Sequence, residues 1–236
     1  MQVDTGVRSL WYNRNMKKYV LLILGIIVAL AFGLRIYKVT EIPPSLSWDE
    51  VSIGYNAYSI LKTGRDEHGR FLPLDTFIAY GDYKPPLSIY FTVPFVAVFG
   101  LNELSVRLPS VLFGTATVFL IYFLVLELLG YVSENTSNTF QKSTQEYLPL
   151  LCAFALSVSP WHINLSRAGF EANIALFFVA LGVLLAMKAI KKPKYWIVSF
   201  LPFVAAVYTF NSARYMVVFL CFGLLVWVRK YIKSNL

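Results

Sequence analysis

Long apolar runs alternate with polar, turn-rich segments along this chain, and the apolar runs predict membrane-spanning helices. The first run covers residues 19 to about 34, and the second covers residues 105 to about 129, where Gly130 is predicted to end the helix. Each run is long enough, with its flanking residues, to cross a hydrocarbon core about 30 Å thick. The pattern therefore predicts an all-α, multi-spanning membrane protein.

Two later apolar runs are too long to be single helices. Residues 147–190 would form a helix of about 66 Å, and residues 195–228 one of about 51 Å. A break is predicted where polar residues gather, at residues 159–167 and again at residues 211–214. Six spans result, near residues 19–37, 105–129, 147–165, 171–190, 195–210 and 214–231.

A long polar and aromatic segment, residues 39–104, separates the first two spans and is predicted to be an external loop. Within it, residues 51–61 predict a short helix and residues 86–99 a more apolar one. The second helix would reach only about 20 Å and contains Pro94, so it is too short to cross the membrane. We expect it to lie in the outer interface instead.

The distribution of Lys and Arg supports this topology. With the N-terminus in the cytoplasm, the basic clusters fall on the cytoplasmic side, as the positive-inside bias predicts. These basic residues are Arg8, Arg14, Lys17, Lys18, Lys188, Lys191, Lys192, Lys194, Arg229, Lys230 and Lys233. A seventh span over residues 86–99 would move the C-terminal clusters outside, which favours six spans. Residues 131–146 then form a cytoplasmic connection.

The first apolar run has a competing interpretation. Residues 29–31 (ALA) resemble a signal-peptidase site, so a cleaved signal peptide is the alternative to a retained helix. We favour retention, because the later spans need this helix as a packing partner.

Composition agrees with a membrane protein and argues against other classes. Of the 236 residues, 57% are hydrophobic and only 14% are charged, too little charge for the surface of a soluble domain. The net charge of +8 does not indicate nucleic-acid binding, because no basic run has the polar surroundings that tracking a phosphate backbone needs. Cys152 and Cys221 both lie inside apolar runs, which argues against a disulfide.

A second set of cations breaks the positive-inside pattern, because it falls on the predicted outer face. The set comprises Arg35, Lys38, Lys84, Arg107, Arg167 and Arg214. Lys38 and Arg107 could be ordinary snorkelling side chains at span ends. For the others, a fixed anionic ligand at the outer leaflet is the economical explanation. A phosphate group fits, because Arg offers a bidentate fork and Lys a point charge.

Several acids share the predicted outer face. Asp49 and Glu50 follow the first span, and Asp82 and Glu171 lie near span ends beside aromatic or apolar residues. A partly desolvated carboxylate in such a place can be tuned as a general base. The plainer alternative is that Trp48 anchors the chain at the interface while the two acids cap the following helix. Asp66, Glu67 and Asp75 are expected to be solvated, and His68 and His162 lack zinc-ligand spacing.

Five segments carry a resemblance to a known family. They are residues 48–50 (WDE), 83–87 (YKPPL), 107–110 (RLPS), 166–171 (SRAGFE) and 208–215 (YTFNSARY). No one of them is specific, but their order and spacing resemble the GT-C superfamily of polyprenyl-phosphate-sugar-dependent glycosyltransferases. The likeness is greatest to the protein O-mannosyltransferase and aminoarabinose-transferase-like branch. In two places the chain departs from the pattern: Tyr83, with Asp82 before it, stands where an acid usually precedes the lysine, and Glu171 stands where relatives often have Asp.

The resemblance implies roles for individual residues. Asp49 would be the catalytic base, and Glu50 and Glu171 would organise that base or hold a divalent cation. Lys84 and Arg214 would hold the departing phosphate. The remaining residues expected to bind substrate are Trp48, Asp82, Tyr83, Arg107 and Arg167.

The resemblance also implies an activity and a location. The chain would be a single transmembrane domain, residues 1–236, in the plasma membrane, with its N-terminus in the cytoplasm and its active site on the external face. It would transfer a hexose or pentose, with inversion, from a polyprenyl-phosphate-sugar donor to a hydroxyl of a glycan, lipid or protein acceptor, in contact with membrane lipid. Members of this family are much longer, so the chain is expected to correspond to the catalytic N-terminal portion.

Two other functions stay open at this point. A transporter or flippase component would need ionisable residues at mid-span, yet the apolar runs are nearly free of them except for Glu127 near an inner end. A non-catalytic assembly subunit would keep the same fold and the same motifs. Transfer of a labelled sugar would separate these functions from an enzyme.

Overall fold

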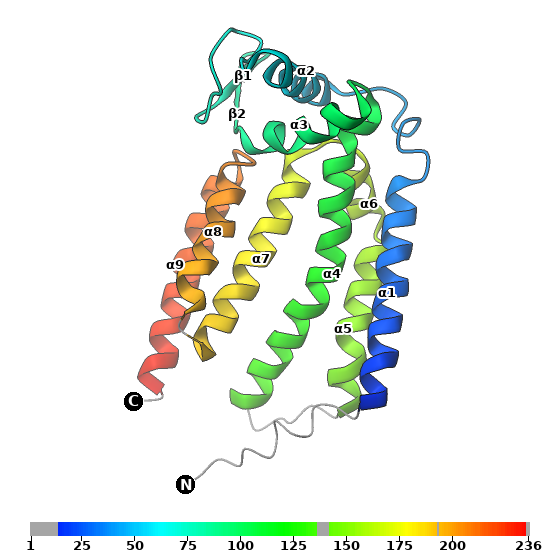
Figure 1. Ribbon diagram of the computed structural model, residues 1–236. Helices are drawn as coiled ribbons and strands as arrows, with labels where there is room; N and C mark the ends of the chain where they lie inside the picture. Colours follow the sequence, from blue (N-terminus) through cyan, green and yellow to red (C-terminus); the bar gives the residue numbers. More distant parts are fainter. Residues whose placement is uncertain (1–13, 136–141, 193, 235–236) are drawn as a thin grey trace.

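The computed structural model describes residues 14–135, 142–192 and 194–234, and its regular elements are helices apart from one small hairpin. The elements are α1 Arg14–Ile36, α2 Trp48–Thr63, β1 Phe77–Ala79, β2 Asp82–Lys84, α3 Leu87–Phe99, α4 Glu103–Asn135, α5 Lys142–Ser157, α6 Pro160–Arg167, α7 Glu171–Lys191, α8 Tyr195–Val207 and α9 Ala213–Ser234. Figure 1 shows the long helices side by side, with α2, the hairpin and α3 gathered at one end of the bundle, here called the α2 end. The prediction of an all-α membrane protein is confirmed.

Three of the described helices are long and apolar enough to cross a membrane: Lys18–Ile36, Glu103–Ser133 and Glu171–Ile190. The pair Tyr147–Ser157 and Pro160–Arg167 is bent by 56° and would be a fourth crossing if it is one broken span. The apolar parts of α8 and α9 are shorter, so three or four of the six predicted spans meet the length requirement in the described part of the chain. Both predicted breaks are confirmed, since α5 gives way to α6 and α8 ends before α9 begins at Ala213.

The helix over residues 86–99, which we placed in the interface, is α3. It has 13 residues and lies across the α2 end instead of running along the bundle (Figure 1). Its apolar side packs on α2, in a buried cluster that includes Ile53, Ala57 and Ile89. Its position relative to a membrane stays a prediction.

The predicted end of the second span was wrong. Helix α4 continues through Gly130 to Asn135. Glycine costs a helix interior only about 1 kcal/mol relative to alanine, and the neighbouring Leu129, which is buried, continues the packed face. Part of the predicted cytoplasmic connection, residues 136–141, lies outside the described residues, as does Arg8.

Helix α7 is packed on two sides, and this packing fixes the position of its first residue, Glu171. On one side Leu184 and Ala180 contact Leu120 of α4. On the other side the close approach of α8 depends on Gly182, where an added Cβ would lie 2.6 Å from the ring of Phe203. Helix α7 is therefore packed closely against both α4 and α8.

The hairpin of β1 and β2 was not predicted. Its three-residue strands are antiparallel, with Phe77 opposite Lys84, and its turn contains Tyr80 and Gly81 at positive φ values of 51° and 80°. Strands this short are not stable alone. Two hydrogen bonds join the segment to the α8–α9 turn: the Leu87 N–H donates to the carbonyl of Tyr208, and the Asn211 side chain donates to the carbonyl of Tyr83, each at 2.9 Å.

Candidate active site

The start of α2 is set by a local capping box. The Ser47 side chain accepts a hydrogen bond from the N–H of Glu50 at 3.3 Å, and the Glu50 carboxylate accepts one from the N–H of Ser47 at 2.8 Å. The capping interpretation is therefore right for Glu50. Asp49, one position earlier, makes no cap and points another way.

Glu50 is held by a buried arginine from α4. The Nε of Arg107 donates to Glu50 Oε1 at 2.8 Å, and the N–H of Gly169 donates to the same oxygen at 3.0 Å. The side chains of Glu50 and Arg107 are only 2% and 0% exposed. Burial alone would raise the pKa of Glu50, but the bonds from Arg107, Ser47 and Gly169 hold it below its ordinary value.

The rest of the Arg107 guanidinium binds backbone carbonyls of the α1–α2 linker. Its two terminal nitrogens donate to Val39, Pro43 and Ser45 at 2.7 to 2.9 Å. Each nitrogen of Arg107 is thus bonded to a group of the chain. We call this arrangement of Glu50, Arg107 and Gly169 the Glu50–Arg107 clamp.

Lys84 lies between two carboxylates from different helices. Its Nζ donates to Asp49 Oδ1 at 2.6 Å and to Glu171 Oε1 at 3.2 Å. The side chains of Lys84 and Glu171 are buried, at 6% and 8% exposed, whereas that of Asp49 is 49% exposed. Burial alone would lower the pKa of Lys84, but the charges of Glu171 and Asp49 raise it above its ordinary value. We call these three residues the acid–lysine cluster.

The chemical capacity of the cluster follows from this difference in exposure. Asp49 uses one carboxylate oxygen for Lys84 and keeps surface that a solvent-borne or membrane-borne hydroxyl can reach. A carboxylate beside a fixed ammonium can accept a proton while the ammonium stabilises an anion nearby. The structure thus brings together three residues that the sequence analysis assigned to catalysis or substrate binding.

Among the described residues, Arg214 makes no hydrogen bond or ion pair with that cluster. It is exposed and lines a pocket of about 230 Å³ with Asp75, Pro86, Val207 and Tyr208. Asp75 is itself paired with Arg70 at 2.5 Å. Lys84 is not among the described residues that line this pocket, so a shared grip of Lys84 and Arg214 on one phosphate stays a prediction.

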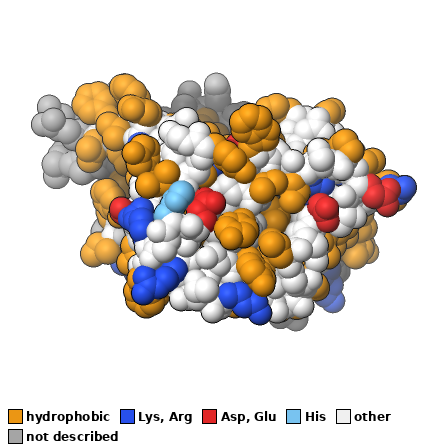
Figure 2. Space-filling model, turned by 90° about the horizontal axis from the view of Figure 1, so that it is seen from above, with side chains coloured by type: hydrophobic (Ala, Val, Ile, Leu, Met, Phe, Trp, Pro, Cys, Tyr) orange, Lys and Arg blue, Asp and Glu red, His pale blue; other side chains and the backbone are white. Residues whose placement is uncertain are grey.

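The other predicted binding residues fall into two kinds. Arg167 is largely buried, and its guanidinium donates to the carbonyls of Leu34, Lys38 and Ile42 at the end of α1 and beyond. Trp48, Asp82 and Tyr83 are exposed instead. Trp48, at 76% exposed, has its ring centroid 5.8 Å from that of Tyr80. Figure 2 shows this end of the molecule, where acidic and basic side chains lie among hydrophobic ones.

Sequence analysis missed a buried polar network beneath the site. Arg35 Nη2 lies 2.7 Å from His162 Nδ1, and because an arginine has no acceptor, this imidazole nitrogen must accept. Asn173 donates to Ser110 at 2.8 Å, which joins α7 to α4. The signal was available, since these polar residues interrupt predicted spans, where each needs a partner.

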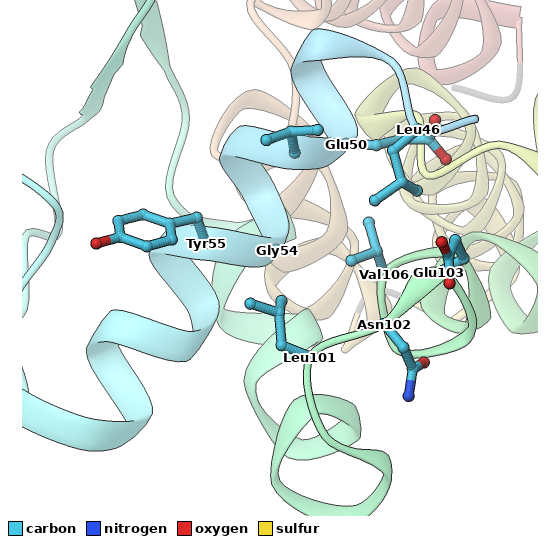
Figure 3. Close-up of a pocket in the computed structure, with 9 residues that line it drawn as sticks. Leu46, Glu50, Gly54, Tyr55, Leu101, Asn102, Glu103 and Val106 are labelled. Atoms are coloured by element: carbon cyan, nitrogen blue, oxygen red, sulfur yellow. The ribbon is translucent and has the colours of Figure 1, made fainter.

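A second pocket lies against the face of α2 that carries Glu50, Gly54 and Tyr55 (Figure 3). It measures about 290 Å³ and is walled mainly by aliphatic side chains, with polar groups of Glu50, Asn102 and Glu103 along it. The carboxylate of Glu50 is already paired with Arg107, so it does not offer an unpaired negative charge to a ligand in this pocket. Among the described residues that line this pocket, none belongs to the acid–lysine cluster.

No ion site is evident in the part of the chain that the structure describes. There, no group of three or more His, Cys, Asp or Glu side chains is arranged to hold a metal ion. Glu50 and Glu171, the two residues expected to hold a divalent cation if one binds, are each engaged by a cationic side chain of the protein.

Comparison with known proteins gives a match to a family model over part of the chain. Residues 83–137 match the family model described as dolichyl-phosphate-mannose-protein mannosyltransferase. No curated protein and no solved structure matches the chain. The matched segment contains Lys84 and Arg107 but neither Asp49 nor Glu171. The match supports, at a coarse level, a membrane glycosyltransferase of the GT-C type.

Proposed function

We propose that this protein transfers a sugar from a polyprenyl-phosphate donor to a hydroxyl-bearing acceptor at the outer face of the membrane. The observation that carries the proposal is the acid–lysine cluster, in which a half-exposed Asp49 lies 2.6 Å from the buried ammonium of Lys84. A proton acceptor and a phosphate-compatible cation lie side by side at one end of an apolar helix bundle. Glycosyl transfer from a lipid phosphate needs both.

The proposed reaction is a single displacement at the anomeric carbon of the sugar. Asp49 takes the proton of the acceptor hydroxyl, and the acceptor oxygen forms a bond to the anomeric carbon of the sugar. The bond from that carbon to the phosphate oxygen breaks, and its electron pair leaves with the polyprenyl phosphate. Attack opposite the leaving group inverts the anomeric centre.

The cations act on the leaving phosphate. Lys84 keeps its proton because Glu171 and Asp49 raise its pKa, so it offers a positive charge to the developing phosphate anion. Arg214, exposed in its own pocket, supplies a second contact at the edge of the hairpin. Glu171 balances Lys84 from the buried side and keeps the ammonium directed toward Asp49.

The test is transfer of label. The full chain in membranes is incubated with radiolabelled polyprenyl-phosphate sugars, and lipid, glycan and protein fractions are counted. We expect label to move from at least one donor with the parent chain and with Glu41→Gln, a control at an exposed ion pair with Lys38. Absence of transfer from a panel of hexose and pentose donors to all fractions would refute the proposal.

A further inference from the structure

The Glu50–Arg107 clamp joins four separate parts of the chain. Glu50 is the third residue of α2, Arg107 belongs to α4, Gly169 lies in the α6–α7 connection, and the carbonyls that Arg107 binds belong to the α1–α2 linker. Such a buried pair is costly to form unless its remaining hydrogen bonds are satisfied. Here Glu50 accepts three bonds and Arg107 donates four, so the pair is well satisfied.

The clamp determines the direction of Asp49. Adjacent side chains on a helix diverge by about 100° around its axis. When the Glu50 carboxylate is fixed toward α4, Asp49 is directed toward the hairpin, where it meets Lys84 at 2.6 Å. A rotation of the first turn of α2 would break both contacts together.

The same carboxylate oxygen also fixes the opposite wall of the cluster. Oε1 of Glu50 accepts the N–H of Gly169, two residues before Glu171. The approach is tight, since a Cβ at Gly169 would lie 3.1 Å from the carbonyl oxygen of Val106 and 3.3 Å from Cγ of Glu50. Both carboxylates that hold Lys84 are therefore located relative to one atom.

We infer that Glu50 and Arg107 are a positioning pair that sets the gap between Asp49 and Glu171 in which Lys84 lies. They touch neither substrate nor the reacting atoms. For catalysis the inference rests on the proposed function, but the geometry it assigns to Lys84 can be measured without any substrate. The sequence led us to expect that Glu50 would organise the base or hold a divalent cation and that Arg107 would bind substrate; here both residues position the cluster without contacting substrate or a cation.

The primary test measures how readily Lys84 loses its proton. The full chain in lipid nanodiscs is treated with a small amine-acylating reagent over a range of pH, and modification of Lys84 is quantified by mass spectrometry. If the gap widens in Arg107→Ala, Lys84 loses contact with Asp49 and Glu171, the two titratable groups that face it. The midpoint of modification then moves to lower pH by about one unit or more.

Two milder variants keep the test decisive if Arg107→Ala does not insert. Arg107→Lys retains the charge opposite Glu50 but loses the bonds to Val39, Pro43 and Ser45, so a smaller shift is expected. Glu50→Gln removes the charge and mismatches the N–H of either Ser47 or Gly169, and we expect a shift in the same direction. The matched control is Arg35→Ala, because Arg35 is also 0% exposed but contacts neither Glu50 nor the linker.

The outcomes separate this inference from the proposed function. A midpoint that shifts in the clamp variants but not in Arg35→Ala supports the positioning pair, even if the parent chain transfers no sugar. If transfer is observed, kcat should fall at least about tenfold in Arg107→Lys with less change in the KM for donor. Midpoints that overlay the parent in Arg107→Lys and Glu50→Gln, or that shift equally in Arg35→Ala, would overturn the inference.

Discussion

Two charged regions lie on either side of the first turn of α2, and they differ in how fully their groups are satisfied. In the Glu50–Arg107 clamp, the carboxylate accepts three hydrogen bonds and both side chains are buried. In the acid–lysine cluster, Asp49 accepts one bond from Lys84 and is half exposed. A fully bonded buried pair can hold a backbone in place but has nothing left for a ligand. A partly bonded, accessible carboxylate can take a proton.

The comparison explains why adjacent acids in one motif need different partners. Asp49 and Glu50 belong to the same helix turn, yet Asp49 faces the hairpin and Glu50 faces α4. In the proposed mechanism, Asp49 can act only if Glu50 holds the first turn of α2 in place, because a general base must lie about 3 Å, between heavy atoms, from the group whose proton it removes.

Replacing Asp49 should have the largest effect. Asp49→Asn is nearly isosteric but cannot accept a proton, so sugar transfer should fall by about 10² to 10⁴-fold, on the order of 3–5 kcal/mol in the barrier. Initial rates of label transfer in membranes measure the change, with insertion checked by the yield of folded protein. Full activity in Asp49→Asn together with an inactive Glu50→Gln would reverse the comparison and make Glu50 the base.

Removing one partner of the Glu50–Arg107 clamp should have the next largest effect, which we expect in the free energy of unfolding. Arg107→Ala leaves a buried carboxylate without its ion partner, which typically costs about 3–5 kcal/mol of unfolding free energy. The exposed pair of Lys38 and Glu41 is the contrast, because Lys38→Ala should cost at most about 1 kcal/mol. Denaturant unfolding of the purified protein in micelles compares the two. Equal losses would mean that burial of the clamp carries no special weight.

Sequence analysis located most of the helices because their signals are local. The break between α8 and α9 occurs where polar residues interrupt an apolar run. Helix α2, expected over residues 51–61, begins earlier, at Trp48, because a Ser47–Glu50 capping box extends its first turn. The hairpin was missed because its three-residue strands depend on docking to the α8–α9 turn, where Asn211 lies 128 positions beyond Tyr83 in the chain.

The site was predictable in its residue types but not in its pairings. Sequence placed Asp49, Lys84 and Glu171 on one face, and the structure brings these three together. The sequence could not show that Arg107 pairs with Glu50, which lies 57 positions away, or that carbonyls of the α1–α2 linker accept hydrogen bonds from the same arginine. A cation at a span end looks the same whether it binds phosphate or backbone. Only the structure, by showing which groups accept its hydrogen bonds, distinguishes the two roles.

Arg214 offers a smaller and sharper test of the cations. If its guanidinium contacts the donor phosphate, Arg214→Ala should weaken donor binding by about 1.5–3 kcal/mol, since one charge-assisted hydrogen bond is worth that much. Arg214→Lys keeps the charge but loses the bidentate fork, so its loss should be nearly as large. Donor titrations of both variants and of Lys84→Ala measure the effect. Three curves that overlay the parent would remove the phosphate role from these cations.

The smallest effect should appear in the acid dependence of stability. The pKa of Glu50 lies below its ordinary value of 4.5, because the bonds from Arg107, Ser47 and Gly169 outweigh the effect of burial. Its contribution to stability is therefore fully present above that ordinary value and is lost as the pH falls through the lowered, folded-state pKa. Asp75, whose pKa is lowered by the backbone N–H of Thr76 and by Arg70, acts in the same direction from the surface.

Thermal unfolding between about pH 7 and pH 3 separates the two carboxylates. Glu50→Gln should be less stable than the parent at neutral pH and should flatten the acid loss, because the buried carboxylate no longer needs to be protonated. Asp75→Asn should change the curve less, since solvent screens an exposed pair. If instead Asp75→Asn flattens the acid loss and Glu50→Gln leaves it unchanged, the clamp is not the region whose charge stabilises this end of the protein, and the contrast between the two regions fails.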